Sequence, residues 1–265
     1  EEQEDTYKSD LMPRYDARTI ARLRQLNEGP ILVLGSATPS VESYVRTMEH
    51  KSTLLTLKER PGKATLPQTE LIDLRRYWNP DTDGLLSQPL LDAMRETLDK
   101  DQQVLLFLNR RGFAASYVCG SCGKSYECPH CSIGMTYHKK RNRLVCHYCG
   151  HMESLHKACP HCGEEAMRLV GVGTEKLEAL CQQYFPDARV VRMDQDRTMG
   201  KNAHAKLLKS FREAPRSILI GTQMVAKGHD FPDLTLAAVV LADQMLGRND
   251  IRAAEKAFQL MTQAG

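Results

Sequence analysis

Short, largely apolar runs alternate with amphipathic segments along most of this chain. Gly, Pro or polar residues bound the runs, which is typical of strands buried in a parallel sheet. They lie at residues 30–35, 103–109, 188–194, 217–221 and 234–243. The segments between them have helical periodicity and lie at residues 16–27, 41–48, 88–98, 176–185, 204–212 and 251–261. Strands that alternate with helices predict an α/β fold with a parallel sheet covered on both faces.

Two further features divide the chain. Residues 75–84, "RRYWNPDTDG", have the Pro, Asp and Gly content of a linker, and residues 53–57 and 69–74 before them are predicted strands. A block of cysteines interrupts the second α/β set between residues 109 and 167. We therefore expect an insertion in one α/β lobe, which the linker joins to part of another lobe.

Composition narrows the class of protein without identifying it. The 265 residues are enough to bury a core, and a net charge of +3 is too small to imply a nucleic-acid partner without a local basic patch. No apolar run is long enough to span a bilayer, and the first residues, "EEQEDTYKSD", open without Met and without a signal peptide. We expect a soluble, cytoplasmic protein and a piece of a longer chain. In that compartment, paired cysteines are thiolates on a metal more often than disulfides.

Eight of the nine cysteines lie in one block at residues 119–162, as four C-x-x-C pairs. A C-x-x-C turn presents two sulfurs to one ion, so two pairs complete a closed tetrahedral site. Four pairs therefore predict two structural zinc sites. Gly123, Gly150 and Gly163 each follow a pair directly, where the backbone must turn tightly under the metal. An iron–sulfur cluster and a redox-active cysteine pair are the alternatives.

The four pairs can be combined in two ways. Sequential pairing joins the first pair to the second, but only five residues separate them, which leaves little chain to wrap around one ion. A nested scheme, which we favour, also ties the two ends of the insertion together. It places Cys119, Cys122, Cys159 and Cys162 on one ion and Cys128, Cys131, Cys146 and Cys149 on the other.

Other residues of the block carry weaker signals. Since eight cysteines suffice for two ions, we expect no ligand among the nearby histidines, which are His130, His138, His147, His151, His156 and His161. The run "HKKRNR" at residues 138–143 is either a solvated hairpin tip or a contact for nucleic-acid phosphates. Cys181, the ninth cysteine, lies on the apolar side of a predicted helix and is expected in the core.

Two turns that leave buried strands carry candidate nucleotide chemistry. They are "GSATPS" at residues 35–40 and "GTQMVAKGHDFP" at residues 221–232. Both follow the carboxyl end of a strand, where α/β sheets bind ligands. The second turn brings the hydroxyl of Thr222, the ammonium of Lys227 and the carboxylate of Asp230 close together in sequence. The chain has no G-x-x-x-x-G-K-[ST] phosphate-binding loop, so we expect no ATP hydrolysis by these residues alone.

Together these stretches resemble the superfamily-two DNA helicases, and among them the bacterial primosomal replication-restart helicases. The resemblance covers nearly the whole chain, in order. It rests on "EEQEDTYKSD", "RYDAR", "LGSATPS", "LLFLNRRGF", the eight-cysteine insertion, "GVGTE", "IGTQMVAKGHDFP" and "RAAEKAFQLMTQ". Few families place a double zinc ribbon inside the second motor lobe, so the combination is far more specific than any single stretch.

The resemblance implies two RecA-like lobes, which in the full-length protein would bind ATP with Mg²⁺ between them. The expected parts are the end of lobe 1 (residues 1–75), the start of lobe 2 (76–116), the zinc-binding insertion (117–166) and the remainder of lobe 2 (167–265). It also implies 3′-to-5′ unwinding at stalled replication forks. The implied partners are single-stranded and forked DNA, other primosome proteins and single-stranded-DNA-binding protein.

The resemblance further assigns roles to individual residues. The opening stretch is similar to the tail of a Walker B box, in which Glu1 would orient or deprotonate the attacking water. Gln3 stands where the family often has His, and it can still bond across the cleft. ATP binding and coupling would fall to Ser36, Thr38, Gly228 and Asp230. DNA binding would fall to Tyr7, Arg14, Tyr15, Arg111, Thr222 and Lys227.

Two interpretations from other classes compete with the helicase. A non-enzymatic zinc-ribbon module on an inert α/β scaffold would bind nucleic acid or protein, and it predicts no phosphate-binding loop upstream. A disulfide oxidoreductase predicts reactive, metal-free cysteines. The chain ends at "TQAG", where the family continues into an arginine-rich motif, so we expect the arginine finger to lie outside these residues.

Overall fold

The computed structural model describes residues 1–9, 11–58, 67–108, 115–138, 141–170, 173–193, 203–221, 231–246 and 251–264. The chain divides into two units. The smaller consists of Glu1–Pro67 with Phe258–Gln263, and the larger consists of Gln68–Ala257. Within the described residues, no helix has the length and apolar character needed to cross a membrane.

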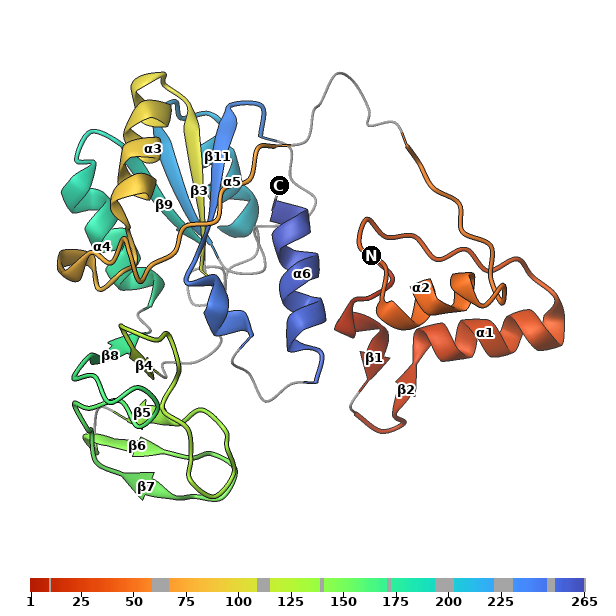
Figure 1. Cartoon of the computed structure of the whole chain (residues 1–265). Coiled ribbons are helices and arrows are strands. Elements are labelled where there is room, and N and C mark those ends of the chain that lie inside the picture. The colour runs from red at the N-terminus through yellow and green to blue at the C-terminus, as the bar shows by residue number, and fades with distance from the viewer. Residues whose placement is uncertain are drawn as a thin grey trace. The chain divides into compact units, whose positions relative to one another are not determined.

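The larger unit is built on a four-stranded sheet in which every neighbouring pair of strands is parallel (Figure 1). Its order is β11 (Leu234–Val240), β3 (Gln103–Leu108), β10 (Ser217–Gly221) and β9 (Arg189–Met193). The two central strands, β3 and β10, are buried at every position, as a strand covered on both faces must be. The predicted α/β fold with a parallel sheet is confirmed.

Helices cover both faces of this sheet (Figure 1). They are α3 (Gln88–Asp99) and α4 (Thr174–Tyr184) on one face and α5 (Ala203–Arg212) on the other; the short η3 (Ala242–Met245) and α6 (Ala253–Ala264) follow β11. Leu106 of β3 belongs to the main core with α3 and α4, whereas its neighbour Leu105 belongs to a second cluster around Phe211 of α5. Successive side chains of β3 thus alternate between the two faces, because a strand has a two-residue period.

A second, antiparallel sheet holds the cysteine block. Its order is β7 (Met152–Glu153), β6 (Arg143–Val145), β5 (Thr136–His138), β4 (Ala115–Cys119) and β8 (Met167–Val170). Because β4 pairs with β8, Cys119 lies opposite Met167 and the two ends of the insertion meet. The core of this sheet is small and consists of Tyr117, Tyr126, Cys128, Met135, Leu144 and Cys146.

The segment before α3 connects the cysteine block to the main core. Trp78 packs against that core, and the guanidinium of Arg168, from β8, lies 3.6 Å from the centre of the Trp78 ring. Arg168 also donates from Nη2 to the carbonyl of Gly120 at 3.3 Å, one residue after the first cysteine. The predicted linker is therefore ordered structure, and it includes a short helix, η2 (Pro80–Thr82).

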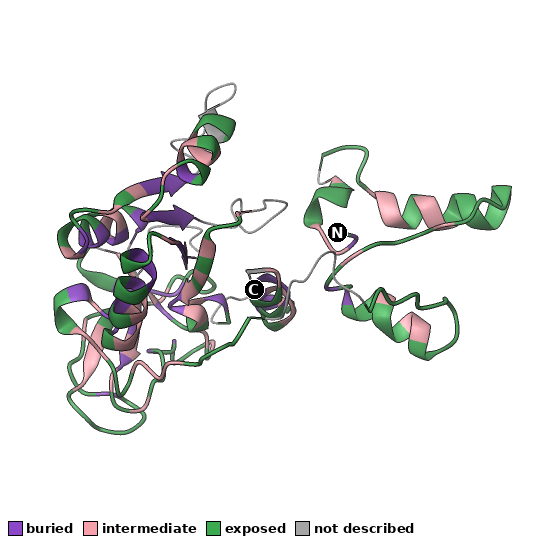
Figure 2. Cartoon of the chain, turned by 90° about the horizontal axis from the view of Figure 1, so that it is seen from above, coloured by how far each residue is buried: buried purple, intermediate pink, exposed green. Residues whose placement is uncertain are grey.

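The smaller unit has regular structure but little apolar core. It contains η1 (Asp5–Tyr7), a hairpin of β1 (Lys8–Ser9) with β2 (Tyr15–Asp16), α1 (Ala17–Glu28) and α2 (Val41–Met48). Asp16 caps α1 by accepting from the N–H of Arg18, and Ser40 caps α2 as predicted. Neither helix buries a single residue, and both are mostly green in Figure 2.

The strands predicted at residues 30–35, 53–57 and 69–74 do not form. Their apolar side chains are exposed instead: Ile31 is 90% exposed, Leu57 is 97% and Leu71 is 95%. A strand satisfies its backbone N–H and C=O groups only through a neighbouring strand. In the part of the chain that the structure describes, no strand pairs with these segments. An apolar run alone therefore did not suffice to predict a strand.

The buried strand β3 yields a test of the core. Leu106→Ala leaves a cavity in the main core, and we expect the free energy of unfolding to fall by about 2–5 kcal/mol. Urea unfolding can be followed through Trp78, the only tryptophan of the chain, which packs against the same core. Leu246→Ala is the matched control, because that side chain is 51% exposed. Equal losses for both variants would contradict the assigned core.

Candidate metal centres and the polar cluster around Glu1

The four C-x-x-C turns converge in two groups of four sulfurs. One group is Cys119, Cys122, Cys159 and Cys162, and the other is Cys128, Cys131, Cys146 and Cys149. Within each group, all sulfur atoms lie within 4.8 Å of one another. These are the groups of the nested scheme. The pairing of β4 with β8 brings the first turn beside the last, and the hairpin of β5 and β6 brings the two middle turns together.

The spacing of the sulfurs fits a single tetrahedral ion in each group. The distances are 3.6 Å for Cys119–Cys162, 3.8 Å for Cys122–Cys159 and 3.6 Å for Cys128–Cys149. Four sulfurs at about 2.3 Å from one zinc ion would lie about 3.8 Å apart, whereas a disulfide would bring two sulfurs to about 2.05 Å. None of the nine cysteines forms a disulfide. The two four-cysteine sites are therefore consistent with two zinc ions.

The residue after the second cysteine shapes each turn. Gly123, Gly150 and Gly163 have φ angles of 78°, 77° and 79°, and each donates its N–H to the carbonyl of the first cysteine of its pair at 2.9 Å. Ser132 occupies the same position in the turn that begins at Cys128, with a φ of 54° and the same 2.9 Å bond. All four turns thus need a left-handed residue, and one of them uses a serine, for which that conformation is strained.

Backbone N–H groups and neighbouring sulfurs set the acidity of the thiols. Burial opposes ionisation of Cys119, but N–H groups of Cys122 and Ser121 point at its sulfur, and the pKa is lowered to about 6. The neighbouring sulfur of Cys149, helped by burial, raises the pKa of Cys131 to about 12. Without a cation, some thiols of a group thus ionise while others retain their protons, because adjacent thiolates repel. A bound divalent cation removes this repulsion, and its binding releases protons.

The histidines of the block do not join either group of sulfurs within the described residues. Four of them instead contact one another in pairs. The rings of His130 and His151 meet edge to face with 4.7 Å between centroids, and Nε2 of His138 lies 3.0 Å from Nε2 of His147. The eight cysteines therefore supply both candidate centres, as expected.

The basic run is described only in part. Arg141 and Arg143 are exposed beside the hairpin of β5 and β6, and Lys139 and Lys140 lie outside the described residues. Cys181, the ninth cysteine, is fully buried in the main core. Burial raises the pKa of its thiol to about 12, so this cysteine stays protonated at neutral pH.

In the smaller unit, polar side chains converge on the carboxylate of Glu1. Ser36 Oγ lies 3.0 Å from Glu1 Oε2 and 2.6 Å from Gln3 Oε1, and its single proton can serve only one of them at a time. Gln3 donates from Nε2 to the same Glu1 oxygen at 2.6 Å. The N–H of Thr38 donates to Ser36 Oγ at 2.9 Å. The structure thus brings together four of the predicted residues from two separate stretches of sequence.

Two glutamines of α6, which also belong to the smaller unit, complete this cluster. Gln263 donates from Nε2 to Glu1 Oε2 at 3.0 Å and lies 3.1 Å from Thr38 Oγ1. Gln259, one helical turn earlier, reaches the carbonyl of Thr38 at 3.4 Å. Sequence reasoning missed both residues. The available signal was the stretch "RAAEKAFQLMTQ", which carried part of the resemblance but to whose residues no role was assigned.

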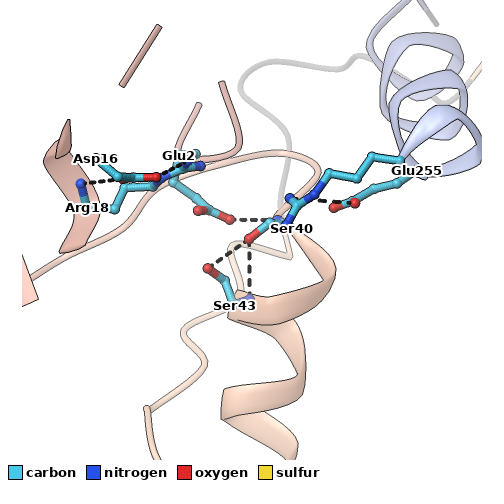
Figure 3. A network of polar contacts seen from close by, with 7 residues as sticks. Glu2, Asp16, Arg18, Ser40, Ser43 and Glu255 are labelled. Carbon is cyan, nitrogen blue, oxygen red and sulfur yellow. Dashed lines mark hydrogen bonds and ion pairs between the residues drawn. The ribbon is translucent and has the colours of Figure 1, made fainter. Parts of the chain in front are cut away.

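Glu2, a third missed residue, fixes the loop that carries Ser36 and Thr38. Its N–H donates to the carbonyl of Gly35 at 3.0 Å, and its Oε1 accepts from the N–H of Ser40 at 2.6 Å (Figure 3). The side chain is buried, although a solvated carboxylate would be the usual expectation. Glu2 therefore holds both ends of the loop against the segment that carries Glu1.

The other predicted site residues fall into two groups. Tyr7, Arg14 and Tyr15 lie in or beside the β1–β2 hairpin, and all three are exposed. The remaining candidates lie outside the described residues, so their predicted roles stay predictions; they are Arg111, Thr222, Lys227, Gly228 and Asp230.

Known proteins match this chain over nearly all its length. Residues 128–153 match the family model described as the PriA DNA helicase Cys-rich region (CRR) domain. The replication restart proteins PriA of Bacillus subtilis (strain 168), Haemophilus influenzae and Rickettsia felis are 45%, 41% and 38% identical to it. These alignments cover 99%, 99% and 100% of the chain but 33%, 36% and 41% of the relatives, so the chain spans little more than a third of their length. The resemblance predicted from the sequence is confirmed: the chain matches, almost from end to end, one part of the PriA replication restart proteins, the part that carries their cysteine-rich region.

Proposed function

We propose that this chain is the motor-core segment of an ATP-dependent DNA helicase that acts in replication restart. The observation that carries the proposal is the cluster in which Gln3, Ser36 and Gln263 donate to Glu1. Neutral donors hold a carboxylate in one orientation without removing its charge. A group that orients or deprotonates an attacking water needs both properties.

The residues of the cluster would divide the work. Glu1 would direct water at the terminal phosphate of ATP, which is bound with Mg²⁺ in the full-length protein. Gln3 and Ser36 would hold Glu1, and Thr38 and Gln263 would pass changes at the nucleotide to the loop and to α6. Asp230 and Gly228 would meet the nucleotide from the second lobe. The phosphates themselves would be held by residues beyond this chain, since its 265 residues contain no phosphate-binding loop.

This assignment extends to the domains. We propose that residues 1–75 end lobe 1, that residues 76–116 and 167–265 form lobe 2, and that residues 117–166 are the inserted metal-binding module. The names of the relatives, replication restart proteins, support a role on DNA at replication forks. Such a role places the proposed activity in the cytoplasm, with other primosome proteins and single-stranded-DNA-binding protein as partners. Translocation from 3′ to 5′ belongs to the same proposal.

Single-stranded DNA would bind first at the β1–β2 hairpin. Tyr7 and Tyr15 are 43% and 53% exposed, although aromatic rings gain by being covered. Stacking of a base on such a ring stabilises binding by about 1–3 kcal/mol and tolerates any sequence. Arg14 beside Tyr15 would contact a phosphate, as would Arg111, Thr222 and Lys227 of the second lobe.

The two four-cysteine sites would hold structural zinc. With four sulfurs on each ion, no coordination position remains for water or substrate, so the metal would not take part in hydrolysis. We propose instead that zinc makes the insertion a stiff element that acts on duplex DNA. The exposed Arg141 and Arg143 would contact its phosphates.

The role of Glu1 can be tested in the full-length protein. Glu1→Gln keeps the size of the side chain but removes the charge, and we expect DNA-stimulated ATP hydrolysis to fall by about 10²–10⁴-fold. Glu28→Gln, an exposed residue of α1 that pairs only with Arg24 among the described contacts, is the matched control. Unchanged hydrolysis in Glu1→Gln would exclude Glu1 as the residue that acts on water. No hydrolysis in the unmodified protein would favour the non-enzymatic zinc-ribbon module.

The role of the insertion can be tested separately. Cys128→Ala removes one sulfur from the second group, and we expect strand separation to be lost, since structural zinc in small modules contributes about 10–16 kcal/mol to folding. ATP hydrolysis stimulated by single-stranded DNA should persist. Cys181→Ala is the control, because it makes the same change outside both groups. If Cys128→Ala unwinds forked DNA at the rate of the control, the insertion does not act on the duplex.

A further inference from the structure

We propose that Arg18 is a positioning residue that links the β1–β2 hairpin to Glu1, so that DNA bound at the hairpin alters the geometry of the hydrolytic carboxylate. This inference rests on the proposed function and adds a residue and a route to it. Arg18 contacts neither nucleotide nor DNA in the assignment above. It acts through the groups that it holds.

Arg18 uses its whole guanidinium in two directions. Nε and Nη2 donate to the two oxygens of Asp16 at 3.0 and 2.7 Å, and Nη1 donates to the main-chain carbonyl of Glu2 at 2.9 Å (Figure 3). The side chain of Arg18 is only 14% exposed and that of Asp16 only 25%, so solvent screens the pair little. The bonds from Arg18 hold the pKa of Asp16 at about 2, so the pair stays charged throughout the physiological range.

One end of this link is the hairpin. Asp16 is the last residue of β2 and pairs with Lys8 of β1, while its neighbour Tyr15 pairs with Ser9. Asp16 also caps α1 through the N–H of Arg18 at 2.9 Å. A base that stacks on Tyr15 therefore acts on the strand whose last residue Arg18 holds.

The other end is the segment that carries Glu1. The carbonyl that Arg18 holds belongs to Glu2, whose N–H and side chain are bonded to Gly35 and Ser40. Between these two contacts lies the loop with Ser36, which donates to Glu1. A shift of Arg18 thus reaches Glu1 by two routes, through the main chain of Glu2 and through the loop that Glu2 fixes.

Only arginine can make these contacts together. Its planar fork binds a carboxylate with two parallel bonds and still has a donor for a third acceptor, whereas a lysine ammonium is a point charge that cannot reproduce both sets. Arg24, on the same helix, shows the contrast. It pairs with Glu28 one turn away, with side chains 67% and 56% exposed, and such a pair contributes little.

The test compares Arg18→Ala, Arg18→Lys and the control Arg24→Ala in the full-length protein. ATP hydrolysis is measured with and without an oligo-dT strand, and the affinity for that strand is measured by fluorescence anisotropy. We expect both Arg18 variants to retain basal hydrolysis and the affinity for DNA, but to lose about tenfold in the stimulation by DNA, the effect of losing a charged hydrogen bond. Arg24→Ala should behave as the unmodified protein does.

Three results would overturn the inference. Full stimulation in Arg18→Ala would show that the link carries nothing, and an equal fall in basal and stimulated hydrolysis would show a merely structural role. Failure of the unmodified protein to hydrolyse ATP would refute the proposed function, and this inference with it. If circular dichroism shows that Arg18→Ala does not fold, Asp16→Asn decides, because it retains an oxygen to cap α1 but removes the charge that Arg18 holds. Loss of stimulation in that variant supports the link, and full stimulation refutes it.

Discussion

Mutual repulsion among four thiolates is the constraint on which the cysteine block depends. Each group packs its sulfurs within 4.8 Å of one another, and without a cation the pKa values of Cys119 and Cys131 separate to about 6 and about 12. The surrounding sheet cannot enforce this arrangement, because its strands have two to five residues and two of its six buried core residues are themselves cysteines. Metal coordination would therefore supply the stability that such a small core lacks.

Coordination would also fix where the block lies within the larger unit. The first group joins the two ends of the insertion, and Gly120 inside that group accepts from Arg168, which lies over Trp78 on the main core. A stiff module anchored in this way can transmit force to a duplex, whereas a flexible loop of the same length cannot. The smaller unit depends on a different interaction. Its helices α1 and α2 bury no residue, so hydrogen bonds around Glu1 and Glu2 hold its site together.

The sequence predicted those features that depend on local pattern. The buried runs at residues 103–109 and 217–221 became β3 and β10, because a parallel strand covered on both faces must be apolar throughout. Chain length between the C-x-x-C turns was sufficient to favour the nested groups. Features that depend on a distant partner were missed. Gln263 reaches Glu1 from the opposite end of the chain, and the apolar run at residues 30–35 forms no strand, since pairing requires a neighbour that periodicity does not reveal.

Zinc K-edge X-ray absorption on the purified, reduced full-length protein tests the central claim most directly. After weakly bound metal is removed by dialysis, we predict two zinc ions per chain, each with four sulfur neighbours at about 2.3 Å and no nitrogen or oxygen neighbour. Fewer than two ions, or a first shell that contains histidine nitrogen, would contradict the account of two closed sulfur sites.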